Sequence, residues 1–143
     1  MSRVSARLRR LVRARAFERC EYCGLAQAGQ EATFHIDHIV PETAGGPKVE
    51  INLAFACVSC SLRKEARRSA ADPETGRKVR LFHPRRQIWD EHFRWEGFSV
   101  VGLTVTGRAT VEALRMNRRV ALRIREEEAE RGRHPPPSGN IPR

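Results

Sequence analysis

The sequence predicts a small α+β protein in which short strands and helices surround a cysteine-bounded centre. Two C-x2-C pairs, 20–23 and 57–60, are separated by the 33 residues of the segment 24–56. A segment between them has the alternating period of a strand, and both flanks have the period of amphipathic helices. With 143 residues, one Tyr, two Trp and six Phe, the chain is long enough for one compact unit with a modest apolar core.

The first half of the chain is expected to contain two helices and two strands. The apolar residues of its first segment share one side at helical spacing, and arginines occupy much of the remaining surface. In the alternating segment, Phe34 and Ile36 are predicted to face a core, and His35 and Asp37 the opposite side. We expect a helix over 2–19, a strand over 33–40, a loop over 42–50, a strand over 51–55 and a helix over 58–68.

The second half is predicted to mix extended and helical segments. Asp72-Pro73 and Gly76 mark a break, and Glu96-Gly97 can turn a hairpin. We expect an extended segment over 78–84, a helix over 85–94 with Ile88, Trp89 and Phe93 pointing inward, a strand over 98–103, a helix capped by Thr106 and ending at Met116, and a helix over 118–130. In domain terms, 1–70 is expected to form an N-terminal helix and the core, 71–131 an α/β extension packed on that core, and 132–143 a disordered Pro-rich tail.

The paired cysteines predict a structural zinc site. Each C-x2-C turn presents two thiolates to one ion, so two such turns complete a closed tetrahedral site. No stretch of the sequence has the length and apolarity of a signal peptide or membrane span, so we expect a cytoplasmic chain with no membrane partner, in which thiols stay reduced. Four ordinary buried thiols and a redox-active pair are the alternatives. The predicted ligands are Cys20, Cys23, Cys57 and Cys60.

The charge balance favours a polyanionic partner. The 27 Lys and Arg residues exceed the 17 Asp and Glu residues, which gives a formal net charge of +10. Most of the basic residues lie outside the cysteine-bounded centre, as a surface that grips phosphates requires. A merely solvated, arginine-rich surface is the alternative.

A second group of residues has the chemistry needed to hydrolyse a phosphodiester. His38 can act as a general base, and Asp37 is a hard oxygen ligand suited to Mg²⁺ or Mn²⁺. Each of these residues taken alone is more often structural than functional, and the cluster with His35 is what favours a functional role. The other three histidines, at 83, 92 and 134, have no such neighbours in the sequence. The basic residues expected to hold phosphate are Arg63, Lys64, Arg67 and Arg68.

The ordered set of motifs resembles the zinc-clamped HNH endonucleases over about 19–67. The resemblance rests on His35-Ile36-Asp37-His38-Ile39-Val40-Pro41, Gly45-Gly46, Asn52-Leu53, Cys57-Val58-Ser59-Cys60 and Arg63-Lys64. It implies a zinc-stabilised ββα-metal core of two short strands, a helix and one divalent ion. The N-terminal helix and the C-terminal hairpin and helices are expected as additions to this core. The resemblance further implies His38 as general base, Asp37 as metal ligand, and Asn52 as the residue whose amide braces the loop that carries the base.

One position departs from the family pattern and keeps the function open. The third family residue, a His or Asn after the last cysteine, falls on Ser61, whose neutral hydroxyl is a poorer metal ligand. Ser61 must therefore bind weakly, act through water or be replaced by a group such as His35. The main hypothesis is a metal-dependent endonuclease acting on double-stranded DNA. The alternatives are a zinc-stabilised nucleic-acid-binding protein that has lost cleavage, and a protein-interaction module built on Trp89, Phe93 and Trp95.

Overall fold

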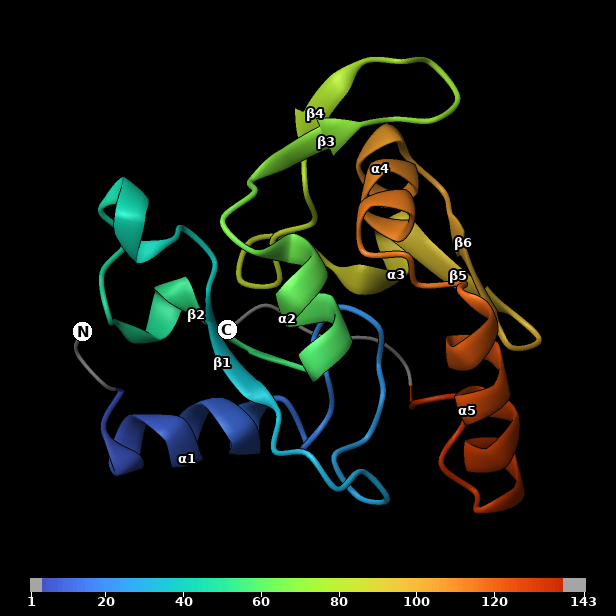
Figure 1. Ribbon diagram of the computed structural model, residues 1–143, viewed down its shortest axis with the longest axis horizontal. Helices are drawn as coiled ribbons and strands as arrows, with labels where there is room; N and C mark the ends of the chain where they lie inside the picture. The colour runs from blue at the N-terminus through green and yellow to red at the C-terminus, as the bar shows by residue number, and fades with distance from the viewer. Residues whose placement is uncertain (1–3, 138–143) are drawn as a thin grey trace.

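The structure is a computed structural model that describes residues 4–137, in which three two-stranded antiparallel ribbons alternate with short helices (Figure 1). The elements are α1 Ala6–Arg15, β1 His35–His38, the 3-10 turns η1 Glu42–Ala44 and η2 Glu50–Asn52, β2 Leu53–Ala56, α2 Val58–Lys64, β3 Ser69–Ala71, β4 Lys78–Arg80, α3 Trp89–His92, β5 Phe93–Glu96, β6 Ser99–Gly102, α4 Val105–Ala113 and α5 Arg119–Glu130.

The central unit is the ribbon β1–β2 followed directly by α2. In its register His35 pairs with Ala56 and His38 with Leu53. Cys57 then caps α2, because its sulfur accepts a hydrogen bond from the backbone N–H of Cys60. The helix packs over β1, so the two-stranded ribbon forms one layer and the helix a second (Figure 1). The predicted α+β class with a ββα core is confirmed.

Helix α1 is fastened to the back of this unit by its arginines. Arg15 donates hydrogen bonds to the backbone carbonyls of Glu50 and Leu53, at 2.7 and 2.6 Å. The Arg13 guanidinium lies 5.4 Å from the ring centroid of Phe55, where it makes a cation–π contact. Val12 of the same helix is fully buried in the apolar core. The helix is therefore held to β2 by both packing and hydrogen bonds.

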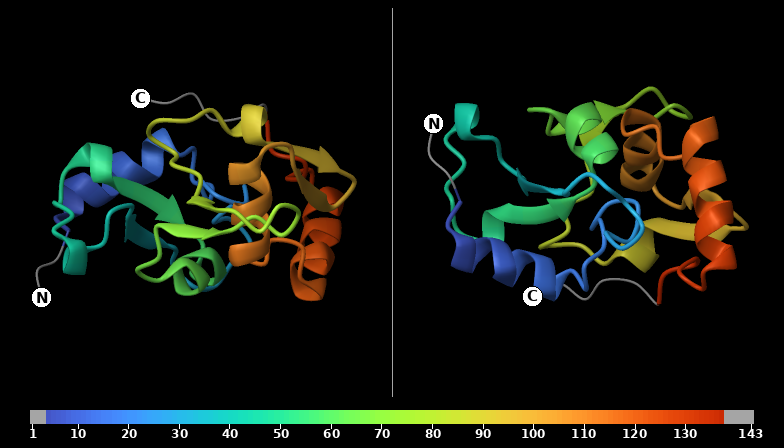
Figure 2. Two further views of the ribbon diagram at one scale, coloured as in Figure 1. Left: turned by 90° about the horizontal axis from the view of Figure 1, so that it is seen from above. Right: turned by 60° about the horizontal axis from the view of Figure 1, so that its bottom comes forward.

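One apolar core joins the two halves of the chain. It combines Tyr22 and Phe55 from the first half with Trp89, Phe93 and other residues from the second. The Trp89 indole donates a 2.8 Å hydrogen bond to the backbone carbonyl of Tyr22, between the first two cysteines. Figure 2 shows the C-terminal elements lying beside the ββα unit in both views. The extension and the core therefore share buried surface.

Two elements of the second half differ from the predicted ones. The helix expected over 85–94 is a single turn, α3, and Phe93 already pairs with Gly102 as the start of β5. Ile88, expected to point inward, is 39% exposed. Phe93 and Trp95 stand at alternate positions, a spacing that favours a strand with Phe93 buried, and pairing with β6 stabilises that strand. Thr104, not Thr106, caps α4, since its hydroxyl accepts a hydrogen bond from Gly107 N–H.

Two differences concern the segment after α2. The helix ends at Lys64, not at residue 68, because Glu65 adopts a left-handed conformation with φ 49°. The strand β3 was not anticipated; it exists through its pairing with β4. The turn between them is organised by Asp72, which accepts hydrogen bonds from Glu74 N–H and Thr75 N–H, both at 3.2 Å. Hydrogen bonding to Arg108 holds the pKa of the Asp72 carboxyl well below its ordinary value.

The first part of the segment predicted to be disordered makes defined contacts. Arg133 pairs with Glu128 at 2.7 Å, and the His134 ring lies 4.7 Å from that of Trp95. Residues 138–143 of that segment lie outside the described residues, as do residues 1–3 of the predicted first helix. None of the helices within 4–137 is long and apolar enough to cross a lipid bilayer.

A buried carboxylate ties the extension to the first cysteine pair. Glu21 lies between Cys20 and Cys23, and its Oε2 accepts a 2.8 Å hydrogen bond from Phe55 N–H. Its Oε1 pairs with Arg85, and the two side chains are only 5% and 6% exposed. Three separate parts of the chain therefore meet at one carboxylate. Such an arrangement is sensitive to the loss of its charge, because a buried guanidinium is expensive to leave without a counter-ion.

We expect Glu21→Gln to lower the free energy of unfolding by about 3–5 kcal/mol, because the buried Arg85 guanidinium loses its carboxylate partner. Urea denaturation followed by tryptophan fluorescence measures the change. Glu127→Gln is the matched control: Glu127 of α5 pairs with Arg131, which follows the helix, and the two side chains are 60% and 58% exposed. That substitution should change stability by less than about 0.5 kcal/mol. Equal effects of the two substitutions would contradict the assignment of Glu21 as a structural anchor.

Candidate functional site

The four cysteines form one buried cluster. Their sulfur atoms all lie within 4.8 Å of one another, and no disulfide joins them. The Cys23 and Cys57 sulfurs are 3.7 Å apart. A tetrahedral zinc ion with bonds of about 2.3 Å places its sulfur ligands about 3.8 Å from each other, so the spacing fits that ion. The predicted grouping of Cys20, Cys23, Cys57 and Cys60 is confirmed, and we refer to it as the cysteine cluster.

The surroundings of the cysteine cluster act differently on its thiols. Hydrogen bonding to the other cysteines lowers the pKa of Cys23 well below its ordinary value, whereas it raises the pKa of Cys60. Burial raises the pKa of Cys20. Arg125 faces the cluster from α5, held by hydrogen bonds to the carbonyls of Phe98 and Met116 at 2.8 and 2.7 Å. A fixed guanidinium beside four sulfurs offsets part of the charge that a tetrathiolate site carries.

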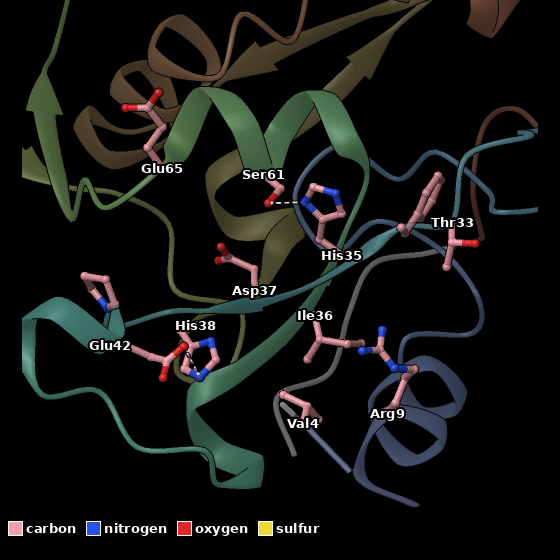
Figure 3. Close-up of a pocket in the computed structure, with 12 residues that line it drawn as sticks. Val4, Arg9, Thr33, His35, Ile36, Asp37, His38, Glu42, Ser61 and Glu65 are labelled. Atoms are coloured by element: carbon pink, nitrogen blue, oxygen red, sulfur yellow. Dashed lines mark hydrogen bonds and ion pairs between the residues drawn. The ribbon is translucent and has the colours of Figure 1, made fainter. Parts of the chain in front are cut away.

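An open pocket of about 550 Å³ lies along β1, and we call it the β1 pocket. Figure 3 shows His35 and Asp37 pointing from β1 toward α2, where Ser61 faces them. Ile36 and His38 point to the opposite side of the strand. This alternation follows from the strand geometry of the segment. The pocket is lined by Val4, Arg9, Thr33, Phe34, His35, Ile36, Asp37, His38, Pro41, Glu42, Ser61 and Glu65.

Asp37 is buried and forms an ion pair. Its Oδ2 lies 3.1 Å from the Lys64 ammonium and accepts a 3.3 Å hydrogen bond from the Tyr22 hydroxyl. Burial raises the pKa of Asp37, and Lys64 acts in the opposite direction. Ile36, expected to be the buried neighbour, is only half-buried. Both contacts are made by Oδ2, which leaves Oδ1 as the carboxylate oxygen that can reach a metal ion in the pocket.

His38 reaches the β1 pocket with a side chain that is 14% exposed. Its Nε2 lies 3.9 Å from Glu42 Oε1, beyond hydrogen-bond length, and has no hydrogen-bond partner among the residues described. The ring therefore lines the pocket, while its Nε2 atom is buried without a hydrogen-bond partner among the described residues.

Asn52 holds the chain that follows His38. Its Oδ1 accepts a 2.8 Å hydrogen bond from Val40 N–H, and its Nδ2 donates to the carbonyls of Val40 and Pro47 at 3.0 and 2.9 Å. Gly46 closes the same turn, where an added Cβ would lie 1.7 Å from the Val40 carbonyl oxygen. The amide therefore fixes the turn on which the position of His38 depends.

Ser61 and His35 form a direct pair. The Ser61 hydroxyl and His35 Nδ1 are 2.8 Å apart, across the gap between α2 and β1 (Figure 3). Both lie on the side of β1 that carries Asp37. Among the described residues, the cysteine cluster is the one group of three or more His, Cys, Asp or Glu side chains close enough to share a metal ion. A second ion at Asp37 would therefore take one or two protein ligands and keep several waters, as Mg²⁺ usually does.

The four basic residues expected to hold phosphate do not form one group. Lys64 is 2% exposed and directs its ammonium at Asp37 and at the His38 carbonyl, 3.2 Å away. Arg67 is exposed and donates to the carbonyls of Arg63 and Ala113. Arg68 is exposed, and Arg63 is half-buried beside Ser59. The arginines lie on the surface next to the site, whereas Lys64 belongs to its interior.

Three pocket residues were missed by the sequence reasoning. Glu42 follows His38 by four residues, and Glu65 follows Ser61 by four. The second spacing places two side chains on one face of a helix, so that pair was readable from the sequence. Arg9 comes from α1, and no spacing in the sequence links it to β1.

Comparison with known proteins gives one match. Residues 20–67 match the model of the family described as HNH endonuclease. A search of curated proteins and a search of solved structures each returned no match. The matched segment begins at the first ligand of the cysteine cluster and includes β1, Asn52, β2 and α2. The likeness to the HNH endonuclease family is therefore shown for residues 20–67.

Proposed function

We propose that this protein is a metal-dependent endonuclease that hydrolyses phosphodiester bonds of double-stranded DNA. The observation that carries the proposal is the β1 pocket, which His38, Asp37, His35 and Ser61 all line, with His38 on the opposite side of β1 from the other three. An imidazole, a carboxylate and a neighbouring pair of weak ligands are the parts that such a hydrolysis requires.

In this proposal His38 deprotonates the attacking water. Histidine is the side chain that most often serves as a general base in enzymes. Glu42 places a carboxylate oxygen 3.9 Å from the ring nitrogen Nε2. Asn52 acts as a positioning residue, because its three hydrogen bonds fix the turn after the base.

Asp37 is the proposed ligand for Mg²⁺ or Mn²⁺, with His35 or Ser61 as a second. When bound, the divalent ion supplies positive charge against the departing oxygen of the phosphodiester. Lys64 orients Asp37 and ties α2 to the backbone after β1, through its contacts with the carbonyls of His38 and Ile39 at 3.2 and 3.5 Å. It is therefore placed to position the ligand and not to contact DNA.

Nucleic-acid binding is assigned to the arginine-rich surface beside the pocket. The net charge of +10 favours a polyanion, and Arg63, Arg67 and Arg68 lie on or just after α2. The extended guanidinium groups suit contacts with backbone phosphates, which position a duplex without reading its sequence.

The cysteine cluster is assigned to one structural zinc ion. Four sulfurs close the coordination sphere, so this ion has no open position for chemistry. We place the protein in the cytoplasm, where the four free thiols stay reduced.

A zinc-stabilised nucleic-acid-binding protein without cleavage is the second candidate. Ser61 at the third family position and the pairing of Asp37 with Lys64 both favour it, because each weakens the site for a divalent ion. Binding without turnover separates this candidate from the first.

Zinc occupancy is the first expected outcome. Protein purified without chelators should contain about one zinc ion per chain by elemental analysis. Cys60→Ser should lose most of the zinc and unfold at a lower temperature, since a structural zinc ion contributes on the order of 10 kcal/mol to folding. Ser59→Ala, in the same turn but without a ligand atom, should keep the metal. Zinc well below one equivalent in the parent protein would refute the site.

Removal of the base is expected to slow cleavage. His38→Ala should cut supercoiled plasmid about a hundredfold or more slowly in Mn²⁺, since general-base catalysis supplies a factor of this size. His134→Ala, which removes an imidazole far from the pocket residues in sequence and outside the pocket lining, should cut like the parent. A His38→Ala variant as fast as the parent would exclude His38 as the base.

A stronger metal ligand at position 61 is expected to maintain or raise the cleavage rate. Ser61→Asn supplies an amide oxygen where the hydroxyl now meets His35, so cleavage should be retained or become faster. The half-saturating Mn²⁺ concentration in the plasmid assay is the measurement, and it should fall. Ser61→Ala is the paired control and should raise it. If both substitutions leave the metal dependence unchanged, Ser61 has no part in holding the ion.

A further inference from the structure

We propose that Arg9 of α1 binds a backbone phosphate of the nucleic acid at the β1 pocket, on the side of the strand that carries His38. The inference rests on the proposed nuclease function and adds a substrate contact from outside the segment 20–67. Arg9 lines the pocket together with His38, Ile36 and Asp37.

The arginines of the first helix divide by what they contact. Arg13 pairs with Glu18 and lies over Phe55, and Arg15 donates to the carbonyls of Glu50 and Leu53. These two side chains are committed to holding the helix. Within residues 4–137, by contrast, the Arg9 side chain takes part in no hydrogen bond or ion pair, and it is exposed. Among these residues the Arg9 guanidinium is therefore left available to bind an anion from solution.

The lining of the pocket holds more acidic side chains than basic ones. Among the lining residues, Asp37, Glu42 and Glu65 carry carboxylates, and Arg9 is the one Lys or Arg. Lys64 neutralises Asp37 from the interior and does not line the pocket. A phosphodiester that enters beside these carboxylates meets repulsion unless a fixed positive group offsets it. Arg9 is placed to supply that charge.

Arg9 lies on the same side of β1 as His38, the proposed base. Figure 3 shows its guanidinium extending from α1 toward Ile36, on the side of β1 where His38 points. A nucleic-acid backbone lying across Ile36 can therefore meet Arg9 at one phosphate while another faces His38. The planar guanidinium donates two parallel hydrogen bonds to a phosphate, which fixes orientation as well as charge.

The helix that carries Arg9 is rigid enough to position it. Ser5 caps α1 by accepting a 3.2 Å hydrogen bond from Leu8 N–H, and Val12 is fully buried one turn after Arg9. The bonds from Arg15 then fasten the other end of the helix to η2 and β2. Side chains on a fixed helix hold a substrate more accurately than side chains on a loop.

Arg10 provides a matched control. It is the next residue of the same helix, is exposed like Arg9, and does not line the pocket. Arg9→Gln and Arg10→Gln remove the same charge from the same element and retain helix-forming side chains. Any difference between them reports on position and not on net charge.

The test measures binding of a fluorescent DNA duplex to the full chain by anisotropy, over a series of salt concentrations, in a His38→Ala background without divalent ions. Arg9→Gln should weaken binding about tenfold and lower the salt slope by about one, as the loss of one phosphate contact requires. Arg9→Lys should recover part of the affinity, and Arg10→Gln should change it less than about twofold. Inorganic phosphate, tested as a competitor, should not displace the duplex at comparable concentration.

Equal effects of Arg9→Gln and Arg10→Gln, no effect of either, or a parent that binds no duplex would each overturn the inference. Displacement by inorganic phosphate alone would also overturn it, by showing a site for free anions. Plasmid cleavage by the chain with His38 intact tests the proposed function separately. A protein that binds DNA through Arg9 but never cuts keeps this inference and removes the nuclease proposal.

Discussion

The cysteine cluster is the constraint on which the rest of the structure depends. It joins a turn near the end of the α1 segment to the start of α2, and the 33 residues between the two turns include both strands of the central ribbon. The chain has few large apolar residues with which to hold such short elements. Four sulfurs in one place replace part of the core that a longer domain would build. The contact of Trp89 with the Tyr22 carbonyl shows that the second half of the chain packs on this same point.

The site itself depends on a second interior contact, between Lys64 and Asp37. A carboxylate with 9% exposure needs a partner to stay charged, and Lys64 at 3.1 Å supplies it. The same ammonium lies near the carbonyls of His38 and Ile39, so one side chain links the helix to two consecutive peptides of the pocket. Asn52 acts on the other side of that segment through Val40. Residues 37–40 are therefore held from two directions.

The sequence was informative where chemistry requires a fixed spacing. The C-x2-C pairs predict the cysteine cluster and the alternation at 34–37 predicts a strand, and both are present, although Asp37 and not Ile36 is the buried residue of that strand. It was uninformative where distant residues decide. Lys64 lies at the end of a helix among other basic residues, where a surface position is expected. Its burial is explained only by the ion pair with Asp37. Phe93 lies in a segment with helical spacing, yet pairing with Gly102 makes it a strand residue. Arg9 enters the pocket through the docking of α1, which no local pattern encodes.

Helix α2 is fixed at both ends, and this has a mechanical consequence. The seven residues of α2 span about 10 Å, with Cys57 and Cys60 of the cysteine cluster at one end and Lys64 bound to Asp37 of β1 at the other. Ser61 lies between the two attachments. A helix held at two points cannot tilt without breaking one of the two attachments, so the cysteine cluster helps to set the distance from Ser61 to His35, although neither residue belongs to it. Under the proposed function, loss of a zinc ion from the cysteine cluster would free one end of α2 and move Ser61 relative to His35. The pocket would then lose its geometry together with the stability that the same ion supplies.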